Sequence, residues 1–475
     1  MNKQVFLTVC SFVFFLTLFT QYKAEGQTPA NSSDLQEQRL NTIRFGTDTE
    51  IANLIRTLRS EQNTNREELM TETPLDRELR TVADRTTNRA ILTGVFGFFS
   101  DRELSGLEER ALRAIQDRDY EAGETVNAAI NYLGNIRARG ILEVMKEIMD
   151  GEENRFLASA ILALGKAAEQ NNPGETAEYL VDYYTTRLPQ GDNSRLIITA
   201  LGDTRSREAT AFLVSIAENE DERVPLRMSA LEGLAKIADP AGLPAIINAA
   251  SSRDPNVRST AVGALGPFSG ENADAAIIEG FRDSYYRTRI AAAKAAGERK
   301  LVPAIPFLRF RCENDEVPTV RDESVRALGL IGTREAETIL NELFTERRNS
   351  DRVRINAAEM LLTHGAADYV NEIIVELDEA RSKNQTALYN GFLRVLGNAV
   401  SPRLEELSRR FFASGGVIEK SYALDMALNN NFRSLEDEIR NLVEPRNSSL
   451  SRKSIALLER WGLPIEALPM EASEG

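Results

Sequence analysis

The sequence is poor in the residues that most catalytic and metal sites require. It contains one histidine and two cysteines in 475 residues. A zinc site built from cysteine and histidine cannot be assembled from so few ligands, and neither can a disulfide framework. General acid–base and nucleophilic catalysis most often use His, Cys or an activated Ser. We therefore expect a protein that has no catalytic residues, cofactor or metal and that acts by binding.

Basic charge and aromatic side chains are also scarce. Lys and Arg number 57 against 72 Asp and Glu, which gives a net charge of -15. This balance argues against nucleic acid as a partner, because a general nucleic-acid binder needs a basic face to neutralise phosphates. Aromatic residues make up 7% and hydrophobic residues 42% of the chain. Such a composition supports a folded, mainly aliphatic core and does not suit a multispan membrane protein.

The N-terminus has the pattern of a secretory signal peptide. A weakly basic start precedes an apolar run from Val5 to Phe19, and small residues stand at Ala24 and Gly26. We expect a signal peptide at 1–26 and a small, polar, flexible leader at 27–36. The apolar run is short for a bilayer span, which needs about 20 residues. An uncleaved signal anchor is the alternative, and it is the only membrane attachment that we expect.

Cleavage after Gly26 would leave Cys312 as the only cysteine. An exported chain without an intrachain disulfide fits a bacterial periplasm or cell envelope better than a eukaryotic secreted module. We therefore expect the mature protein in the bacterial periplasm, in the envelope or outside the cell.

The remainder of the chain repeats one unit of about 33 residues. The segment from Val257-Arg258 to Ala264-Leu265-Gly266 matches the segment from Val320-Arg321 to Ala327-Leu328-Gly329. Weaker copies begin at Leu226, Thr288, Val353 and Asn88. The closing glycine, or the residue in its place, recurs at Gly97, Gly134, Gly165, Gly202, Ala235, Gly266, Gly297, Gly329, Leu362, Gly397, Leu428 and Gly462.

Each copy has room for two helices. In the copy from Val257, the apolar residues at spacings of four, seven and eight share one helical face. Asp254 and Pro255 supply an N-cap and a first-turn proline, and the closing glycine suits a left-handed C-cap. Second helices are expected at 243–250, 336–344, 370–377 and 403–412. No useful stretch alternates with a period of two, so we predict an all-α chain.

This pattern, carried by Asp254 to Gly266 and its copies, resembles the HEAT repeat family in its short bacterial form, which is also found in phycobilin lyases. The resemblance implies an α-solenoid of about 12 HEAT-like helix pairs. We place the solenoid at 37–463, with its best repeats at 80–463, and a C-terminal tail at 464–475. We expect Trp461 to help cover the last apolar face. The resemblance also implies a binding surface that is often concave and is lined by the second helix of each unit.

Six arginines recur at one position of the repeat. In HEAT proteins this position typically makes polar contacts between neighbouring repeats, and the resemblance implies the same structural role here. An arginine-lined ligand groove is the alternative. The six residues are Arg89, Arg227, Arg258, Arg289, Arg321 and Arg354.

One segment departs from the acidic trend. Residues 281–311 include eight basic and two acidic residues. The functional hypothesis is a basic, aromatic-bearing patch for an anionic partner, either an acidic protein segment or an envelope polymer. The alternative is that these residues are ordinary surface side chains of two helices and have no binding role. The candidate partner-binding residues are Arg282, Tyr285, Tyr286, Arg287, Lys294, Arg299 and Lys300.

We therefore expect an exported, non-catalytic scaffold or adaptor that binds protein partners through an extended solenoid surface. One alternative is a lyase-like enzyme or enzyme subunit of the HEAT-like family. Such an enzyme would have few reactive side chains beyond those of His364 and Cys312. We expect His364 at the end of a helix and Cys312 as a buried thiol. The other alternative is a binder of envelope polymer through 281–311.

Overall fold

The computed structural model describes residues 32–61, 72–151, 154–187, 191–364, 369–443 and 448–463. Over these residues the chain has 26 α-helices and no strand, which confirms the all-α prediction. The chain divides into two compact units, Met1–Thr204 (unit 1) and Arg205–Gly475 (unit 2), which we describe separately. The expected signal peptide at 1–26 and the expected tail at 464–475 lie outside the described residues.

Unit 1 contains the first ten described helices. They are α2 (Ser32–Phe45), α3 (Asp48–Glu61), α4 (Pro74–Arg85), α5 (Arg89–Asp101), α6 (Glu108–Gln116), α7 (Gly123–Asn135), α8 (Leu142–Asp150), α9 (Leu157–Ala167), α10 (Pro173–Arg187) and α11 (Asp192–Asp203). Helix α2 begins at Ser32, so it takes up the second half of the leader expected at 27–36. Asp34 lies in its first turn, where a carboxylate is favourable for the helix dipole.

Unit 2 contains the other sixteen described helices. They are α12 (Thr210–Glu218), α13 (Val224–Ile237), α14 (Leu243–Ala249), α15 (Pro255–Ala264), α16 (Glu271–Gly280), α17 (Tyr286–Glu298), α18 (Ile305–Asn314), α19 (Pro318–Ile331), α20 (Arg334–Thr345), α21 (Asp351–His364), α22 (Tyr369–Ser382), α23 (Thr386–Gly397), α24 (Leu404–Ser414), α25 (Val417–Asn430), α26 (Glu436–Arg440) and α27 (Ser449–Arg460). The four expected second helices correspond to α14, α20, α22 and α24.

The sequence repeat suggested that each Val-Arg helix pairs with the helix that follows it. In the structure it pairs with the helix that precedes it. An even-numbered helix packs on the odd-numbered helix that follows it, as α12 does on α13 and α20 on α21. The odd-numbered helices also stack directly on one another, as α15, α17 and α19 do. We call the even-numbered helices the first-helix layer and the odd-numbered helices the second-helix layer. The Val-Arg motif therefore lies on the second helix of each pair, and our placement of it on the first was wrong.

Several closing glycines serve close packing between helices rather than the left-handed C-caps that we expected. Gly134 and Gly297 lie inside α7 and α17. A Cβ atom at Gly134 would stand 2.7 Å from the Cα of Ala163, and one at Gly297 would stand 2.9 Å from the Cα of Ala327. Among these closing glycines only Gly462 has a left-handed φ, at 72°. The missing side chains thus let neighbouring second helices approach each other closely.

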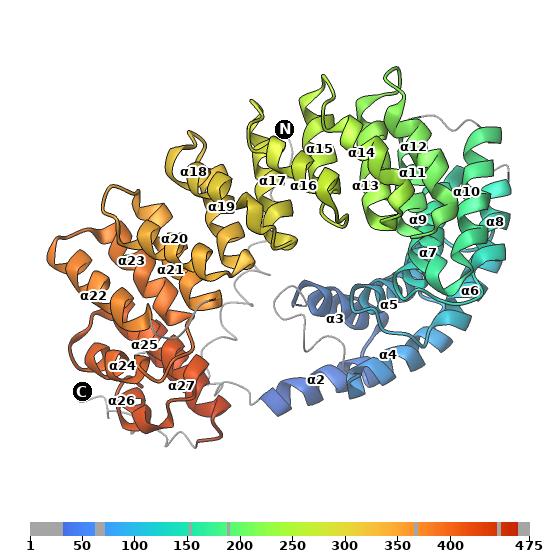
Figure 1. Ribbon diagram of the computed structural model, residues 1–475. Coiled ribbons are helices and arrows are strands. Elements are labelled where there is room, and N and C mark those ends of the chain that lie inside the picture. The colour runs from blue at the N-terminus through green and yellow to red at the C-terminus, as the bar shows by residue number, and fades with distance from the viewer. Residues whose placement is uncertain are drawn as a thin grey trace, which may run out of the picture. The chain divides into compact units, whose positions relative to one another are not determined.

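This close approach explains the curvature within unit 2. Packed helices stand about 8–10 Å apart depending on the side chains between them, and glycine permits the lower value. A stack that is tighter in one layer must bend toward that layer. Figure 1 shows α19, α21 and α25 along the inner side of the curve in unit 2, and α18, α22 and α24 along its outer side.

One local prediction is confirmed, and a second agrees with the structure. Asp254 caps α15, because its Oδ1 accepts hydrogen bonds from the amides of Asn256 (2.8 Å) and Val257 (3.1 Å). Trp461 directly follows α27 and is buried, as expected for a residue that covers the end of a stack. Among the described helices, none combines the length and the apolar character that a membrane crossing needs.

Candidate protein-binding groove

The repeated arginines of unit 2 link neighbouring helix pairs. Nε and Nη2 of Arg258 donate to Asp283 at 2.7 and 3.0 Å. Arg289 makes the same two-point contact with Asp315, at 2.7 and 2.9 Å. Arg258 also donates to the carbonyl of Ser252, at 3.0 Å, in the turn before its own helix. Each of these two arginines therefore joins the turn before its own helix to the turn before the next second helix.

The electrostatics of the two aspartates agree with this geometry. Burial disfavours their charged form, but hydrogen bonds from Arg258 and the Tyr285 amide outweigh it and lower the pKa of Asp283. The pKa of Asp315 is lowered in the same way, against burial, by Arg289 and the Val317 amide. Both carboxylates are thus held as anions inside the stack.

The other four repeated arginines contact mainly backbone. In unit 2, Arg227 donates to the carbonyl of Ala217 at 3.1 Å and Arg321 to that of Asp315 at 2.5 Å. Arg354 donates to the carbonyl of Phe344 at 2.9 Å and to Glu376 at 2.6 Å. Arg89, in unit 1, is exposed and donates to the carbonyl of Tyr120 at 3.3 Å.

The candidate basic patch separates into two groups at opposite ends of α17. Arg282, Tyr285, Tyr286 and Arg287 lie at or before its start, whereas Lys294, Arg299 and Lys300 lie toward or beyond its end. A helix of 13 residues spans about 18 Å between its first and last residue at 1.5 Å per residue. The structure therefore places the seven residues in two separate groups rather than in one cluster.

Carboxylates of neighbouring helices also neutralise much of this charge. Arg282 pairs with Glu279 at 2.5 Å, and Arg299 pairs with Asp274. Lys294 lies 3.9 Å from Glu298. Glu279 and Asp274 belong to α16, which directly precedes the segment whose charges we counted. The count missed them because residues close in space were not included with residues close in sequence.

Aromatic rings do accompany the first group. The guanidinium of Arg282 lies 5.0 Å from the centre of the Phe307 ring, and that of Arg287 lies 5.9 Å from the Tyr286 ring. Tyr285 contacts Tyr286 edge to face and donates from its hydroxyl to Asn256 at 3.1 Å. Of these side chains, only that of Arg282 lines the groove described below.

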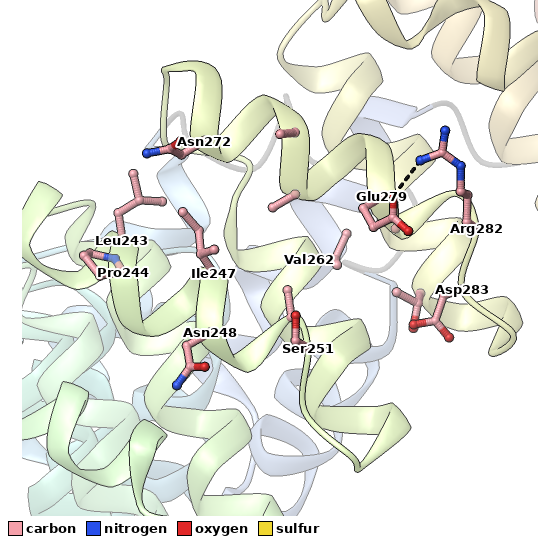
Figure 2. A pocket seen from close by; sticks show the side chains of 15 residues that line it. Leu243, Pro244, Ile247, Asn248, Ser251, Val262, Asn272, Glu279, Arg282 and Asp283 are labelled. Atoms are coloured by element: carbon pink, nitrogen blue, oxygen red, sulfur yellow. Dashed lines mark hydrogen bonds and ion pairs between the residues drawn. The ribbon is translucent and has the colours of Figure 1, made fainter.

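The groove lies between α14 and α16, with α15 and the turn before α17 at its base, and has a volume of about 820 Å³. Figure 2 shows Glu279, Arg282 and Asp283 at one end, Ile247 and Val262 in the middle, and Leu243, Pro244 and Asn272 at the other end. Asn248 and Ser251 add polar groups at the rim. The groove thus combines an apolar centre with hydrogen-bonding groups at its ends, as ligand sites generally do.

The local sequence explains why this space is open. Helix α14 has only seven residues, and α16 presents the small residues Ala275 and Ala276 to the groove. Both helices belong to the first-helix layer, which is the outer and wider one in unit 2. Of the residues that line this groove, the sequence indicated only Arg282, as part of the basic patch, and not the apolar centre, whose residues come from three helices.

The structure describes the two reactive residues singled out from the sequence to different extents. Burial raises the pKa of the Cys312 thiol, which is therefore held in its neutral form. His364 is the last residue of α21, and its side chain lies outside the described residues. Over the described ranges, no group of three or more His, Cys, Asp or Glu side chains is placed to hold a metal ion.

Stacked helix pairs, a repeated Val-Arg position and grooves between neighbouring helices together define an α-solenoid repeat protein. The chain belongs to the Spirochaete HEAT repeat protein family, whose model matches residues 43–457. This match confirms the resemblance to the HEAT repeat family. No curated protein matches the chain.

Solved structures of a karyopherin are similar to the chain at low identity. Kap121p bound to Ste12p has 15% identity and a TM-score of 0.43 over 91% of this chain and 53% of that one. Kap121p bound to the extreme C-terminus of the protein phosphatase Cdc14p has 14% identity and a TM-score of 0.44 over 97% and 57%. Kap121p bound to Nup53p has 14% identity and a TM-score of 0.43 over 91% and 53%. The chain spans about half the length of these structures.

Proposed function

We propose that this chain is an exported, non-catalytic scaffold that binds protein partners, and that the groove between α14 and α16 is one of its docking sites. The observation that carries the proposal is the make-up of this groove. It offers about 820 Å³ of space with an apolar centre, and the Glu279–Arg282 pair and Asp283 lie at one end. Such a surface suits an extended segment of a protein that buries one or two apolar side chains and hydrogen-bonds at its ends.

The roles of the recurring polar residues support a scaffold. In unit 2 the arginines of the Val-Arg position and their aspartates connect helix pairs, so these charges maintain the stack. The side chains that vary between repeats are left to form grooves. Repeat proteins commonly use such extended surfaces for binding.

Photocrosslinking in the native cell tests the docking site. We would place p-benzoyl-phenylalanine at Asn272, which is exposed in the groove, and at Lys294, which is exposed on α17 and does not line it. We expect one protein to be crosslinked in near-stoichiometric yield from position 272 and not from position 294. Ala276→Trp should abolish the crosslink, because the indole would fill the groove without disturbing a buried ion pair.

Two results would contradict this proposal. One is equal crosslinking from the two positions, or none from position 272. The other is turnover of a small molecule by the purified chain with no partner recovered, which would favour the lyase-like alternative. The envelope-polymer alternative depended on one continuous basic surface at 281–311, and the split of those residues between the two ends of α17 gives it little support.

Export is part of the same proposal and has a test of its own. Its support is the apolar run from Val5 to Phe19 with small residues at Ala24 and Gly26. We expect cell fractionation to recover the protein from the periplasm or envelope, and N-terminal sequencing to begin at Gln27. A chain that retains its first residues in the cytosolic fraction would show that the protein is not exported.

A further inference from the structure

A second groove, in unit 1, differs in chemistry from the one between α14 and α16. It lies on the second-helix layer across α3, α5 and α7, which stack in succession (Figure 1). The groove has a volume of about 840 Å³. Its arginines are Arg56, Arg59 and Arg89, and its carboxylates are Asp101 and Glu124. The remaining lining residues are Ala52, Ile55, Ser60, Ala90, Thr93, Gly94, Ala122 and Thr125.

The spacing of residues on α3 directs its polar side chains into this groove. Ala52, Ile55, Arg56, Arg59 and Ser60 follow one another at helical spacing and share one face. The facing residues of α5 are small, so the guanidinium groups have room. Thr93 and Thr125 form a hydroxyl pair at 2.9 Å across α5 and α7, which provides hydrogen-bonding groups on the floor of the groove.

Arg59 is held in place. Its Nε donates to Asp101 at 2.7 Å, and its guanidinium lies against α5 where Gly97 has no side chain. A Cβ atom at Gly97 would stand 2.4 Å from Nη1 of Arg59. The closing glycine of this repeat thus accommodates an arginine, whereas Gly134 and Gly297 accommodate a neighbouring helix.

Arg56 and Arg89 differ from Arg59 because, within the described residues, no carboxylate pairs with them. Arg56 donates to the side chain of Asn53 at 2.8 Å, and Arg89 donates to the carbonyl of Tyr120 at 3.3 Å. Both arginines are exposed. They therefore remain available to an anion from outside the chain.

The reason that Arg89 is available lies in the turn before α7. Asp283 and Asp315, which bind the equivalent arginines of unit 2, each stand three residues before the start of the next second helix. In unit 1 the residue three before the start of α7 is Tyr120. Its side chain is 86% exposed and cannot pair with the guanidinium as a carboxylate would. Arg89 therefore lacks the carboxylate partner that Arg258 and Arg289 have.

We propose that this groove binds an acidic, extended peptide segment of a partner protein, with carboxylates held by Arg56, Arg59 and Arg89. Arginine binds carboxylates through two parallel hydrogen bonds. Arg89 and Gly97, where Arg59 lies, are separated by about 12 Å along α5 at 1.5 Å per residue. An extended peptide covers that distance in about four residues and presents alternate side chains to one side. The site therefore favours acidic residues at alternate positions.

A defined peptide tests this inference on the full-length chain. The probe is a fluorescein-labelled nonapeptide with glutamate and serine at alternate positions, and its control has glutamine in place of glutamate. We expect the glutamate peptide to bind about tenfold or more tightly than the glutamine peptide, since charge-assisted hydrogen bonds are the strong ones. Arg56→Glu combined with Arg89→Glu should remove this difference. Arg77→Glu combined with Arg85→Glu, an equal charge change at two exposed arginines of α4 outside the groove, should preserve it.

A second pair of variants tests whether peptide binding requires that the Arg89 guanidinium has no carboxylate partner within the chain. Tyr120→Asp restores the carboxylate that Arg89 lacks and should weaken the glutamate peptide severalfold, whereas Tyr120→Asn should not. Equal affinity for both peptides, or unchanged affinity in the double variant, would overturn the proposal. Equally strong competition by a sulfated polysaccharide would also overturn it, because the site would then recognise any polyanion. This inference rests on the proposed function and adds the chemistry of the partner. The peptide-binding assay and the α14–α16 crosslink are independent, so either can fail while the other succeeds.

Discussion

Arg89 in unit 1 and Arg289 in unit 2 occupy the same position of the repeat in opposite environments. Arg289 is buried against a fully buried Asp315, whereas Arg89 is exposed in a groove and reaches only a backbone carbonyl. The helices that carry them belong to the same layer and begin with similar motifs. The difference therefore does not arise in the helix that carries the arginine.

One residue that differs between the two contacts lies in the turn before the next second helix. Asp315 caps that turn by accepting from the Val317 amide at 3.0 Å, and it receives Arg289 with both of its oxygens. Tyr120 can do neither with its side chain. A stacking contact in a repeat protein thus depends on a residue about 30 positions away, in the neighbouring repeat.

The largest effect on this comparison should come from Asp315→Ala in unit 2. The substitution leaves the buried Arg289 without its partner and also removes the cap at Val317. Removing one member of a buried pair typically costs about 3–5 kcal/mol. We expect a loss near the lower value in the free energy of unfolding, measured by urea denaturation.

Glu316→Ala is the matched control for that substitution. Glu316 is the next residue, is exposed and lies outside the arginine contact. Its replacement should change stability by less than about 0.5 kcal/mol. Equal losses in the two variants would show that the arginine–aspartate contact does not hold the helix pairs together.

The next largest effect should come from the closing glycine. Gly297→Val would bring a side chain within 2.9 Å of the Cα of Ala327, so α17 and α19 would have to separate. Overpacking of this kind costs about 1–3 kcal/mol. Gly263→Ala is the control, because its Cβ would stand 4.0 Å from the Ala291 Cβ. It should stabilise α15 by about 0.5–1 kcal/mol. A loss from Gly263→Ala equal to that from Gly297→Val, in thermal unfolding, would disprove the packing role.

These glycines show how far the sequence could predict the fold. The repeat period and the cap at Asp254 predicted helix pairs and their stacking, because apolar periodicity and caps are local signals. The phase of the pair and the role of Gly297 depend on which helix approaches which, and this is decided by packing between residues about 30 positions apart. A left-handed cap and a close helix contact both require glycine, so the residue type alone does not distinguish them.

The candidate sites show the same limit. The count of charges at 281–311 identified Arg282 but missed Asp274 and Glu279, which neutralise that segment from α16. The groove of unit 1 contains Arg89, which the sequence analysis grouped with five structural arginines. Tyr120 stands in place of aspartate there, but Arg227 is buried although Ser252 holds the equivalent position, so the absence of aspartate alone was not a sufficient signal.

A smaller effect should appear on acidification. The pKa of Asp315 in the folded chain lies below its ordinary value, because hydrogen bonds from Arg289 and the Val317 amide outweigh the effect of burial. A carboxylate whose pKa is lowered by folding stabilises the fold above its unfolded pKa of about 3.9 and loses that contribution as the pH falls through its folded value. We expect the stability difference between the natural chain and Asp315→Asn to be full at pH 7 and to shrink below about pH 4. A difference that stays constant in urea melts from pH 7 to pH 3 would contradict the ion pair.

The smallest effect, and the most direct test of the comparison, is Tyr120→Asp in unit 1. The new carboxylate stands three residues before α7, as Asp315 does before α19, and should pair with Arg89. Because Arg89 is exposed, the pair should raise stability by only about 0.2–1 kcal/mol. The gain should disappear in Tyr120→Asn, in Tyr120→Asp combined with Arg89→Gln, and at high salt, where exposed pairs are screened. If Tyr120→Asp stabilises the chain equally with and without Arg89, the substitution acts through the conformation of the turn. The arginine–aspartate contact of unit 2 would then have no counterpart in unit 1.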